Sequence, residues 1–367
     1  MDSERQGVGM TGTDRPAAWV GCFTRGTGGQ GERVEVVRRV GEVWRGPARR
    51  PAVEPPVISP SFLVHAPVPD RLYAVSEAPE GELVGYRIEP DGTAVPDDRV
   101  ASGGSFPCHL AVAPGGAFLV TAHYGSGTVA VHALDGAGRL GRRTDLLAHT
   151  GNGPDPDRQE GPHPHQAVFV GDLLLVPDLG LDVVRSYRLD AHGRLAPAGP
   201  DGVLPPGFGP RHLVALPGGR IAVVGELAGA IALLALDPVT AASTLLDVAA
   251  TTGRSGRCAP SGIGVDPAGR WVAVANRGVE TVAVFAVPAP GQGWSPPRET
   301  WCGGTEPRDL TVDGDRIHVA NQHGGGLITL QVLPGGGGSP AGPTIRRTGR
   351  GVALGSPTCV LPARPAR

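Results

Sequence analysis

Two histidines flank a proline in the stretch QEGPHPHQAVF, which runs from Gln159 to Phe169. Imidazoles bind metal ions and also transfer protons near neutral pH, so His163 and His165 could do either. The proline between them fixes divergent directions for the two side chains, and no compact set of carboxylates or cysteines accompanies them. A metal site is therefore the weaker interpretation, and we expect neither a metal nor another cofactor. For His165 a catalytic or binding role is favoured over a purely structural loop end.

A repeat positions this segment and six others like it. Each copy has a proline, two variable residues, an alternating apolar run, a turn, and a second apolar run that ends in polar residues. The copies begin at Pro60, Pro107, Pro164, Pro210, Pro260, Pro307 and Pro357. The first and last of these prolines are 297 residues apart, a mean of 49.5 residues per copy. This period is typical of β-propeller blades, which have roughly 40 to 50 residues each.

The repeat predicts an all-β, seven-bladed propeller of four-stranded blades. Each full copy continues into a third strand, such as TVAVHAL, and a weaker fourth strand. The seventh copy stops after one strand, whereas AAWVGCFT and RVEVVRRVGEVW supply strands before the first copy. We expect these N-terminal strands to close the last blade, which removes a bare sheet edge. One domain would then span residues 16–362, with a disordered leader at 1–15, a flexible glycine run at 334–340 and a tail at 363–367.

Composition and charge narrow the function classes. The chain of 367 residues contains 58 glycines and 38 prolines, too many for long helices, and its net charge of −2 argues against a nucleic-acid partner. No run of about 18 apolar residues predicts a membrane span, and the N-terminus lacks the apolar segment of a signal peptide. Five scattered cysteines predict buried thiols. We expect a cytoplasmic protein, a monomer or weak homo-oligomer, whose partner is a small molecule.

The starts of the first strands and the ends of the second strands should meet at one mouth of the propeller channel, because these two ends of a hairpin lie side by side. The first set is Ser61, Cys108, His109, His165, Arg211, His212, Ser261, Arg308, Asp309 and Thr358. The second set is Glu77, His123, Tyr124, Asp178, Glu226, Asn276, Arg277, Asn321 and Gln322. Packing of a repeat does not require a ring of ionisable residues, so we predict a functional site there.

Within this ring, charged groups are costly to bury unless they are paired or face water. We therefore select Arg211, Arg277 and Glu226, together with His165, as the reacting groups. Asp178 could equally well bond the backbone amides of its own turn. Asn276 and Asn321 are interpreted as turn-forming residues. The further substrate contacts that we predict are His109, His163, Asp178, His212 and Arg308.

Seven motifs resemble the lactonase family of seven-bladed propellers. They are YGSGTVAVHAL, RQEGPHPHQAVF, VPDLGLDVV, GFGPRHL, GELAGAIALL, ANRGVETVAVF and EPRDLTV, and they follow the family's order over about residues 55–362. The family includes propeller-type 6-phosphogluconolactonases and the fungal carboxy-cis,cis-muconate cyclase. The resemblance implies a histidine, two arginines and a glutamate at the site, which fall on His165, Arg211, Arg277 and Glu226. One departure is Gly225, where the resemblance implies an asparagine.

The resemblance implies hydrolysis of 6-phosphogluconolactone or a related acidic sugar lactone. Either Glu226 or His165 could activate water, and Arg211 and Arg277 suit the oxyanion and the anionic end of the substrate, with Arg308 further out. A lactonising cycloisomerase could use the same residues. A non-catalytic binding module is the alternative of another class, although its usual exposed aromatic residues are few here. The loop at residues 149–163 could be a lid or a static surface loop.

Overall fold

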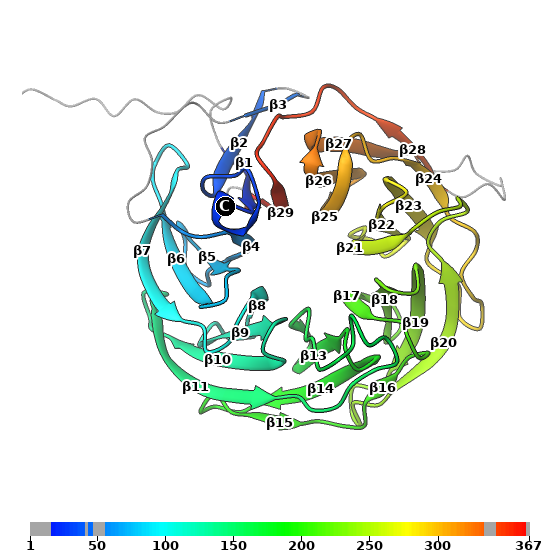
Figure 1. Ribbon diagram of the computed structural model, residues 1–367, viewed down its shortest axis with the longest axis horizontal. Coiled ribbons are helices and arrows are strands. Elements are labelled where there is room, and N and C mark those ends of the chain that lie inside the picture. The colour runs from blue at the N-terminus through cyan, green and yellow to red at the C-terminus, as the bar shows by residue number, and fades with distance from the viewer. Residues whose placement is uncertain (1–15, 41–42, 47–55, 334–342, 365–367) are drawn as a thin grey trace, which may run out of the picture.

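Seven β-sheets stand in a ring in the computed structural model, which describes residues 16–40, 43–46, 56–333 and 343–364 (Figure 1). Six sheets are built from consecutive strands, and within each the strands run in order from the inside of the ring to its outside. The predicted all-β, seven-bladed architecture is confirmed. Among the described residues no helix is long and apolar enough to cross a membrane. The one short helix described there is the 3-10 turn η1 (Arg25–Thr27).

The strands of the first three blades follow the copies that begin at Pro60, Pro107 and Pro164. The first blade has β4 (Pro60–His65), β5 (Arg71–Ser76), β6 (Glu82–Ile88) and β7 (Ala94–Ala101). The second has β8 (Pro107–Val112), β9 (Phe118–His123), β10 (Thr128–Leu134) and β11 (Leu140–Ala148). The third has β12 (Val168–Val170), β13 (Leu173–Asp178), β14 (Val183–Leu189), β15 (Leu195–Pro197) and β16 (Gly202–Val203).

The next three blades follow in the same way. The fourth has β17 (Pro210–Leu216), β18 (Arg220–Gly225), β19 (Ala230–Leu236) and β20 (Ser243–Ala250). The fifth has β21 (Ala259–Val265), β22 (Trp271–Arg277), β23 (Thr281–Ala286) and β24 (Arg298–Trp301). The sixth has β25 (Thr305–Asp313), β26 (Arg316–Gly324), β27 (Gly326–Leu333) and β28 (Thr344–Arg347).

The seventh blade joins the two ends of the chain. It combines β29 (Pro357–Pro362) with β1 (Pro16–Cys22), β2 (Glu35–Val40) and β3 (Val43–Arg45), in that order from the inside. Val20 pairs with Val360 in the antiparallel ladder between β1 and β29. The expected closure by the N-terminal strands is confirmed. The expected leader at 1–15 and the glycine run at 334–340 lie outside the described residues. Of the expected tail at 363–367, the structure describes Ala363 and Arg364, and Ala363 N donates to Ala17 O at 2.8 Å.

Burial explains why the inner strands carry apolar residues on both faces. Every residue of β5, β13 and β22 is buried, whereas the outermost strand β20 contains only partly buried and exposed residues. Each inner strand is sandwiched between neighbouring blades, and the apolar clusters span two adjacent sheets. The apolar core therefore lies between adjacent blades. The ends of the inner strands lie outside this core, where polar side chains can be placed.

The third blade departs from the repeat at its inner edge. Its first strand, β12, begins only at Val168, and Pro164 forms an isolated bridge with Asp178. His165 N donates to Pro177 O at 3.0 Å, which fixes the backbone before the strand begins. His165 is thus held by the sheet without belonging to a continuous ladder.

Candidate functional site

The residues that follow the repeat prolines stand in β-bulges. Pairing between the first two strands changes register directly after Pro60, Pro107, Pro210, Pro260 and Pro307. A bulge sets two residues against one partner and re-aims side chains. Several residues just before these prolines also adopt the left-handed conformation, including Phe106 and Glu306. This local geometry explains why the variable positions of the repeat turn toward one end of the ring.

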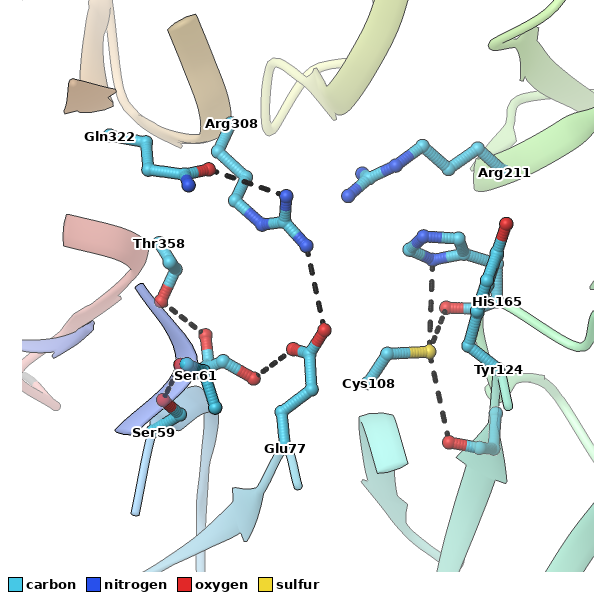
Figure 2. A network of polar contacts seen from close by, with 12 residues as sticks. Ser59, Ser61, Glu77, Cys108, Tyr124, His165, Arg211, Arg308, Gln322 and Thr358 are labelled. Atoms are coloured by element: carbon cyan, nitrogen blue, oxygen red, sulfur yellow. Dashed lines mark hydrogen bonds and ion pairs between the residues drawn. The ribbon is translucent and has the colours of Figure 1, made fainter. Parts of the chain in front are cut away.

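A pocket lies where these positions converge. It is lined by Ser61, Phe62, Glu77, Cys108, His165, Arg211, His212, Arg308, Asp309 and Thr358. Arg211 and Arg308 reach into it from opposite sides and point toward one another, with His165 on the Arg211 side and Glu77 on the Arg308 side (Figure 2). The positional rule of the repeat therefore brings together residues that are far apart in the sequence.

Glu226 lies beside this pocket and joins three arginines. Its Oε2 is 3.1 Å from Arg211 Nε and 2.6 Å from Arg277 Nη2, and Arg158 Nη2 donates to its Oε1 at 2.6 Å. Burial alone would raise the pKa of Glu226, but the guanidiniums of Arg277, Arg211 and Arg158 outweigh burial and hold that pKa well below its usual range. Glu226 is consequently an ionised carboxylate with both oxygens engaged.

Arg211 is held rigidly at the pocket wall. Its Nη1 donates to Ser261 O at 2.8 Å and lies 3.5 Å from His212 Nε2, and its side chain is 3% exposed. Burial and the nearby charge of Arg277 lower the pKa of Arg211 to about 10, so the guanidinium remains charged at neutral pH. Its Nε forms an ion pair with Glu226, but the N–H does not point at the carboxylate, and Nε has no hydrogen-bond partner among the described residues. Arg211 is a fixed positive charge at the pocket.

Three histidines meet next to Arg211. The ring centroids of His165 and His212 are 5.3 Å apart, and those of His109 and His212 are 5.5 Å apart. Burial, followed by the charge of Arg211, lowers the pKa of all three imidazoles, that of His109 to about 3. All three are neutral at physiological pH, and they do not add positive charge to the mouth.

His165 presents an open nitrogen to the pocket. Its Nδ1 lies 3.9 Å from the thiol of Cys108, which also donates to its carbonyl oxygen at 3.4 Å (Figure 2). Burial raises the pKa of the Cys108 thiol, so the thiol stays protonated. The other ring nitrogen of His165, Nε2, has no hydrogen-bond partner within the described ranges. A neutral imidazole in this state can accept a proton from water.

Two of the predicted substrate contacts face the protein instead of the pocket. Asp178 is fully buried, accepts from the backbone N–H groups of His163 and Gly180, and pairs with His149 Nδ1 at 2.6 Å. His163 donates from Nδ1 to Tyr124 O at 2.7 Å and stacks on the Tyr124 ring. The contacts of Asp178 match the alternative interpretation, in which it bonds the backbone amides of its own turn. His163 is a structural residue of the loop at 149–163, since its ring bonds and stacks on Tyr124.

The remaining predicted residues divide into two groups. His165, Arg211, His212 and Arg308 line the pocket. Glu226, Arg277 and His109 stand behind it. Glu226 forms an ion pair with Arg211, Arg277 forms one with Glu226, and the ring of His109 contacts those of His212 and Phe62. Arg277 also lies 3.7 Å from Glu306. Three of the four residues selected as reacting groups are thus linked by charge, and the fourth, His165, lies on the same side of the pocket as Arg211 (Figure 2).

Arg158 was missed by the sequence analysis. It belongs to the loop at 149–163, which the repeat leaves out, and it reaches Glu226 and, at 3.4 Å, Tyr124 OH. The loop is tied down by Gln159, whose amide donates to Leu179 O and to Asp182 Oδ1 at 2.8 Å each. The available signal was its position in a loop for which a lid was one of the two interpretations.

Gly225 departs from the family pattern for a steric reason. A Cβ atom at this position would lie 2.7 Å from the Phe208 carbonyl oxygen and 2.8 Å from the Phe208 ring. Phe208 is buried in the core between the third and fourth blades. A side chain such as asparagine would not fit before Glu226 without moving Phe208, so the chain uses glycine there.

The described residues contain no group of three or more histidine, cysteine, aspartate or glutamate side chains that could hold a metal ion. The polar groups of the pocket instead form ion pairs and hydrogen bonds with one another. The site thus combines a neutral imidazole, fixed guanidiniums and carboxylates, a set suited to acid–base chemistry on an ester-like bond.

Comparisons with known proteins agree with this architecture. Residues 17–362 match the family described as lactonase, 7-bladed β-propeller. The chain is 31% identical over 269 residues to the 6-phosphogluconolactonase of Bacillus subtilis (strain 168), which covers 71% of this chain and 76% of that protein. Two solved structures are each 27% identical to this chain, with coverage of 95% of this chain and 99% of theirs. They are a protein of Lactobacillus plantarum, with a TM-score of 0.84, and the periplasmic gluconolactonase of Pseudomonas aeruginosa, with a TM-score of 0.83. The chain belongs to the lactonase family of seven-bladed β-propellers.

Proposed function

We propose that this protein hydrolyses a lactone of an anionic sugar acid, with 6-phosphogluconolactone as the first candidate. The observation that carries the proposal is the open Nε2 of the neutral His165 in a pocket whose wall also holds the fixed charge of Arg211. Lactone hydrolysis needs a base for water and a positive group for the carbonyl oxygen, and these two residues supply both.

In the proposed reaction His165 takes a proton from water as the water oxygen attacks the lactone carbonyl carbon. Arg211 stabilises the negative charge that develops on the carbonyl oxygen. The bond between the carbonyl carbon and the ring oxygen then breaks. The imidazolium returns its proton to the departing ring oxygen, which leaves a hydroxy acid. A positioned base of this kind contributes about 10² to 10⁴ in rate.

Glu226 serves in this proposal as a positioning residue and not as the base. Both of its oxygens contact arginines, so neither oxygen is free to take a proton from water. Its negative charge fixes Arg211 and Arg277 and offsets part of their mutual repulsion. Arg158, whose side chain is 36% exposed, is the most accessible of the three arginines and suits the anionic end of the substrate.

The carboxylates at the mouth favour a sugar lactone over a muconate with several carboxylates. Glu77 and Asp309 line the pocket together with Arg211 and Arg308, so the lining itself has no large excess of positive charge. A substrate with three carboxylates would meet like charges there. The relative named 6-phosphogluconolactonase in Bacillus subtilis supports the same choice.

The proposal is tested by hydrolysis of freshly generated 6-phosphogluconolactone, with the product detected by a coupled dehydrogenase. We expect a rate above the spontaneous background that falls at least 100-fold in His165→Asn and in Arg211→Ala. His192→Asn, at an exposed loop position, is the matched control and should keep the wild-type rate. A wild-type rate equal to the background would reject this substrate, and an active His165→Asn variant would reject the assigned base.

A further inference from the structure

A second cluster of polar side chains faces His165 across the pocket. It consists of Ser61 on β4, Glu77 directly after β5, and Arg308 on β25. Ser61 Oγ donates to Glu77 Oε2, and Arg308 Nη1 donates to Gln322 Oε1 at 3.3 Å (Figure 2). The backbone of Ser61 is held in turn by the hydroxyl of Thr358, at 2.7 Å. None of these residues has a part in the proposed acid–base chemistry.

The ion pair in this cluster is looser and more accessible than those around Glu226. Arg308 Nη2 lies 3.6 Å from Glu77 Oε1, beyond hydrogen-bond distance, and the two side chains are 19% and 14% exposed. Glu226 and Arg211, by comparison, are 6% and 3% exposed. Glu77 Oε1 and Arg308 Nη2 have no hydrogen-bond partner in the part of the chain that the structure describes. One acceptor and one donor are therefore open side by side.

The arrangement suits hydroxyl groups better than a second anion. Glu77 and Arg308 together carry no net charge, so this side of the pocket does not attract an anion strongly. A hydroxyl can donate to the Glu77 carboxylate and accept from the Arg308 guanidinium, and each is a charge-assisted hydrogen bond. The gap of 3.6 Å leaves room for the two groups to bind neighbouring hydroxyls instead of one another.

Two aromatic rings support this geometry. The Arg308 guanidinium carbon lies 4.5 Å from the centroid of the Phe23 ring, a cation–π contact that limits where the guanidinium can move. Phe62 lines the pocket beside Ser61, and its ring centroid is 3.9 Å from that of His109. Phe62 offers an apolar surface to the C–H groups of a sugar, next to the hydrogen-bonding pair.

We propose that Glu77 and Arg308, with Ser61, form a subsite that recognises adjacent hydroxyl groups of the substrate. The subsite would select polyhydroxylated lactones over unsubstituted ones, while Arg158 binds the anionic end. This inference deepens the proposed lactone hydrolysis, and the role of the subsite in choosing a substrate rests on that proposed function. The binding contacts themselves do not require turnover.

Direct binding tests the subsite without any reaction. Calorimetric titration would compare glucitol 6-phosphate with n-hexyl phosphate, which has the same chain length and charged group but no hydroxyls. We expect the wild-type protein to bind glucitol 6-phosphate at least tenfold more tightly. Glu77→Gln should weaken glucitol 6-phosphate about tenfold and leave n-hexyl phosphate within twofold of wild type.

The control is Glu306→Gln, which removes a carboxylate that lies 3.7 Å from Arg277 but does not line the pocket. This variant should keep the wild-type preference. If Glu77→Gln does not fold, Glu77→Asp keeps the charge, shortens the reach and should lose part of the preference. Equal binding of the two ligands by the wild type, or an equal loss of both in Glu77→Gln, would overturn the subsite.

The outcomes separate this inference from the proposed function. A protein that prefers glucitol 6-phosphate through Glu77 but hydrolyses no lactone supports the subsite and rejects the hydrolase. A protein that hydrolyses 6-phosphogluconolactone with no difference between the two ligands supports the hydrolase and rejects the subsite. Failure of the wild type to bind either ligand also rejects the subsite.

Discussion

Arg158 Nη2 lies 2.6 Å from Glu226 Oε1, although the two residues are 68 positions apart. Arg158 comes from the loop that enters the third blade, whereas Glu226 directly follows β18 in the fourth blade. The loop that the repeat leaves out is therefore connected to the charged cluster through one side chain. Because Glu226 also holds Arg211 and Arg277, a change in the loop can affect the whole cluster.

We predict that Arg158→Ala raises the KM for 6-phosphogluconolactone about tenfold and changes kcat less. The variant removes the most accessible guanidinium for the anionic end but leaves His165 and Arg211 in place. Stability should change little, since partly exposed ion pairs contribute about 0–1 kcal/mol. Steady-state kinetics measure the effect. Arg194→Ala is the control, because Arg194 also pairs with a carboxylate, Asp145 at 3.5 Å, away from the pocket. Equal KM values in Arg158→Ala and the wild type would remove Arg158 from the substrate site.

Glu226→Gln is expected to lower the free energy of unfolding by about 3–5 kcal/mol. The variant leaves Arg211 and Arg277 buried without their carboxylate, and uncompensated buried charges are costly. Urea denaturation at pH 7 measures the difference. Glu89→Gln, which disrupts the more exposed pair with Arg87, should cost less than about 1 kcal/mol. A similar small cost for Glu226→Gln would mean that the cluster does not depend on this carboxylate.

Much of the architecture and part of the site followed from the repeat alone. The post-proline positions placed Arg211 and Arg308 in the pocket because the β-bulges turn these positions toward the same end of the ring. The ends of the second strands marked Glu77, although its oxygen without a hydrogen-bond partner among the described residues became visible only in the structure. A repeat pattern predicts which positions converge, since it reports the backbone path.

The pattern could not decide what each converging side chain does. Asp178 ends a second strand like Glu226, yet it is fully buried against His149 and backbone amides. Nor could the sequence choose between Glu226 and His165 as the base, because that choice depends on which atoms are already engaged, and both oxygens of Glu226 contact guanidiniums. The contact of Arg158 arises from a loop with no counterpart in the other copies, so no periodicity pointed to it.

Asp309 should make ligand binding depend on pH around 6. Burial raises the pKa of this pocket carboxyl to about 6, although the charge of Arg211 acts against the shift. Above that pH the ionised carboxylate repels an anionic ligand, so affinity should fall as pH rises. Gluconate stays ionised between pH 5 and 7.5, and we expect its Kd to rise about fivefold over this range. Calorimetry on Asp309→Asn should show a constant Kd. A wild-type Kd that does not change with pH would contradict the assignment.

Buried neutral histidines should make the fold sensitive to acid. Burial lowers the pKa of seven imidazoles in the described ranges, namely His65, His109, His123, His132, His165, His212 and His318. Below pH 6.5 these groups take up protons in the unfolded chain but not in the folded one, so the free energy of unfolding falls as pH falls. Each contributes about 1.4 kcal/mol per pH unit between its two pKa values. Asp309 is one group that acts in the opposite direction, because its raised pKa makes its contribution to the free energy of unfolding increase as pH falls.

His318→Asn isolates one of these contributions away from the pocket. Burial lowers the pKa of His318 to about 3, and its Nδ1 bonds Thr329 Oγ1 at 2.9 Å, a contact that an asparagine amide can replace. We expect urea denaturation between pH 6 and 5 to show a smaller loss of stability in this variant, by about 1.4 kcal/mol per pH unit. His192→Asn, at an exposed position, should keep the wild-type slope. An unchanged slope in His318→Asn would show that this imidazole becomes protonated inside the folded protein, and that burial next to Trp44 does not keep it neutral.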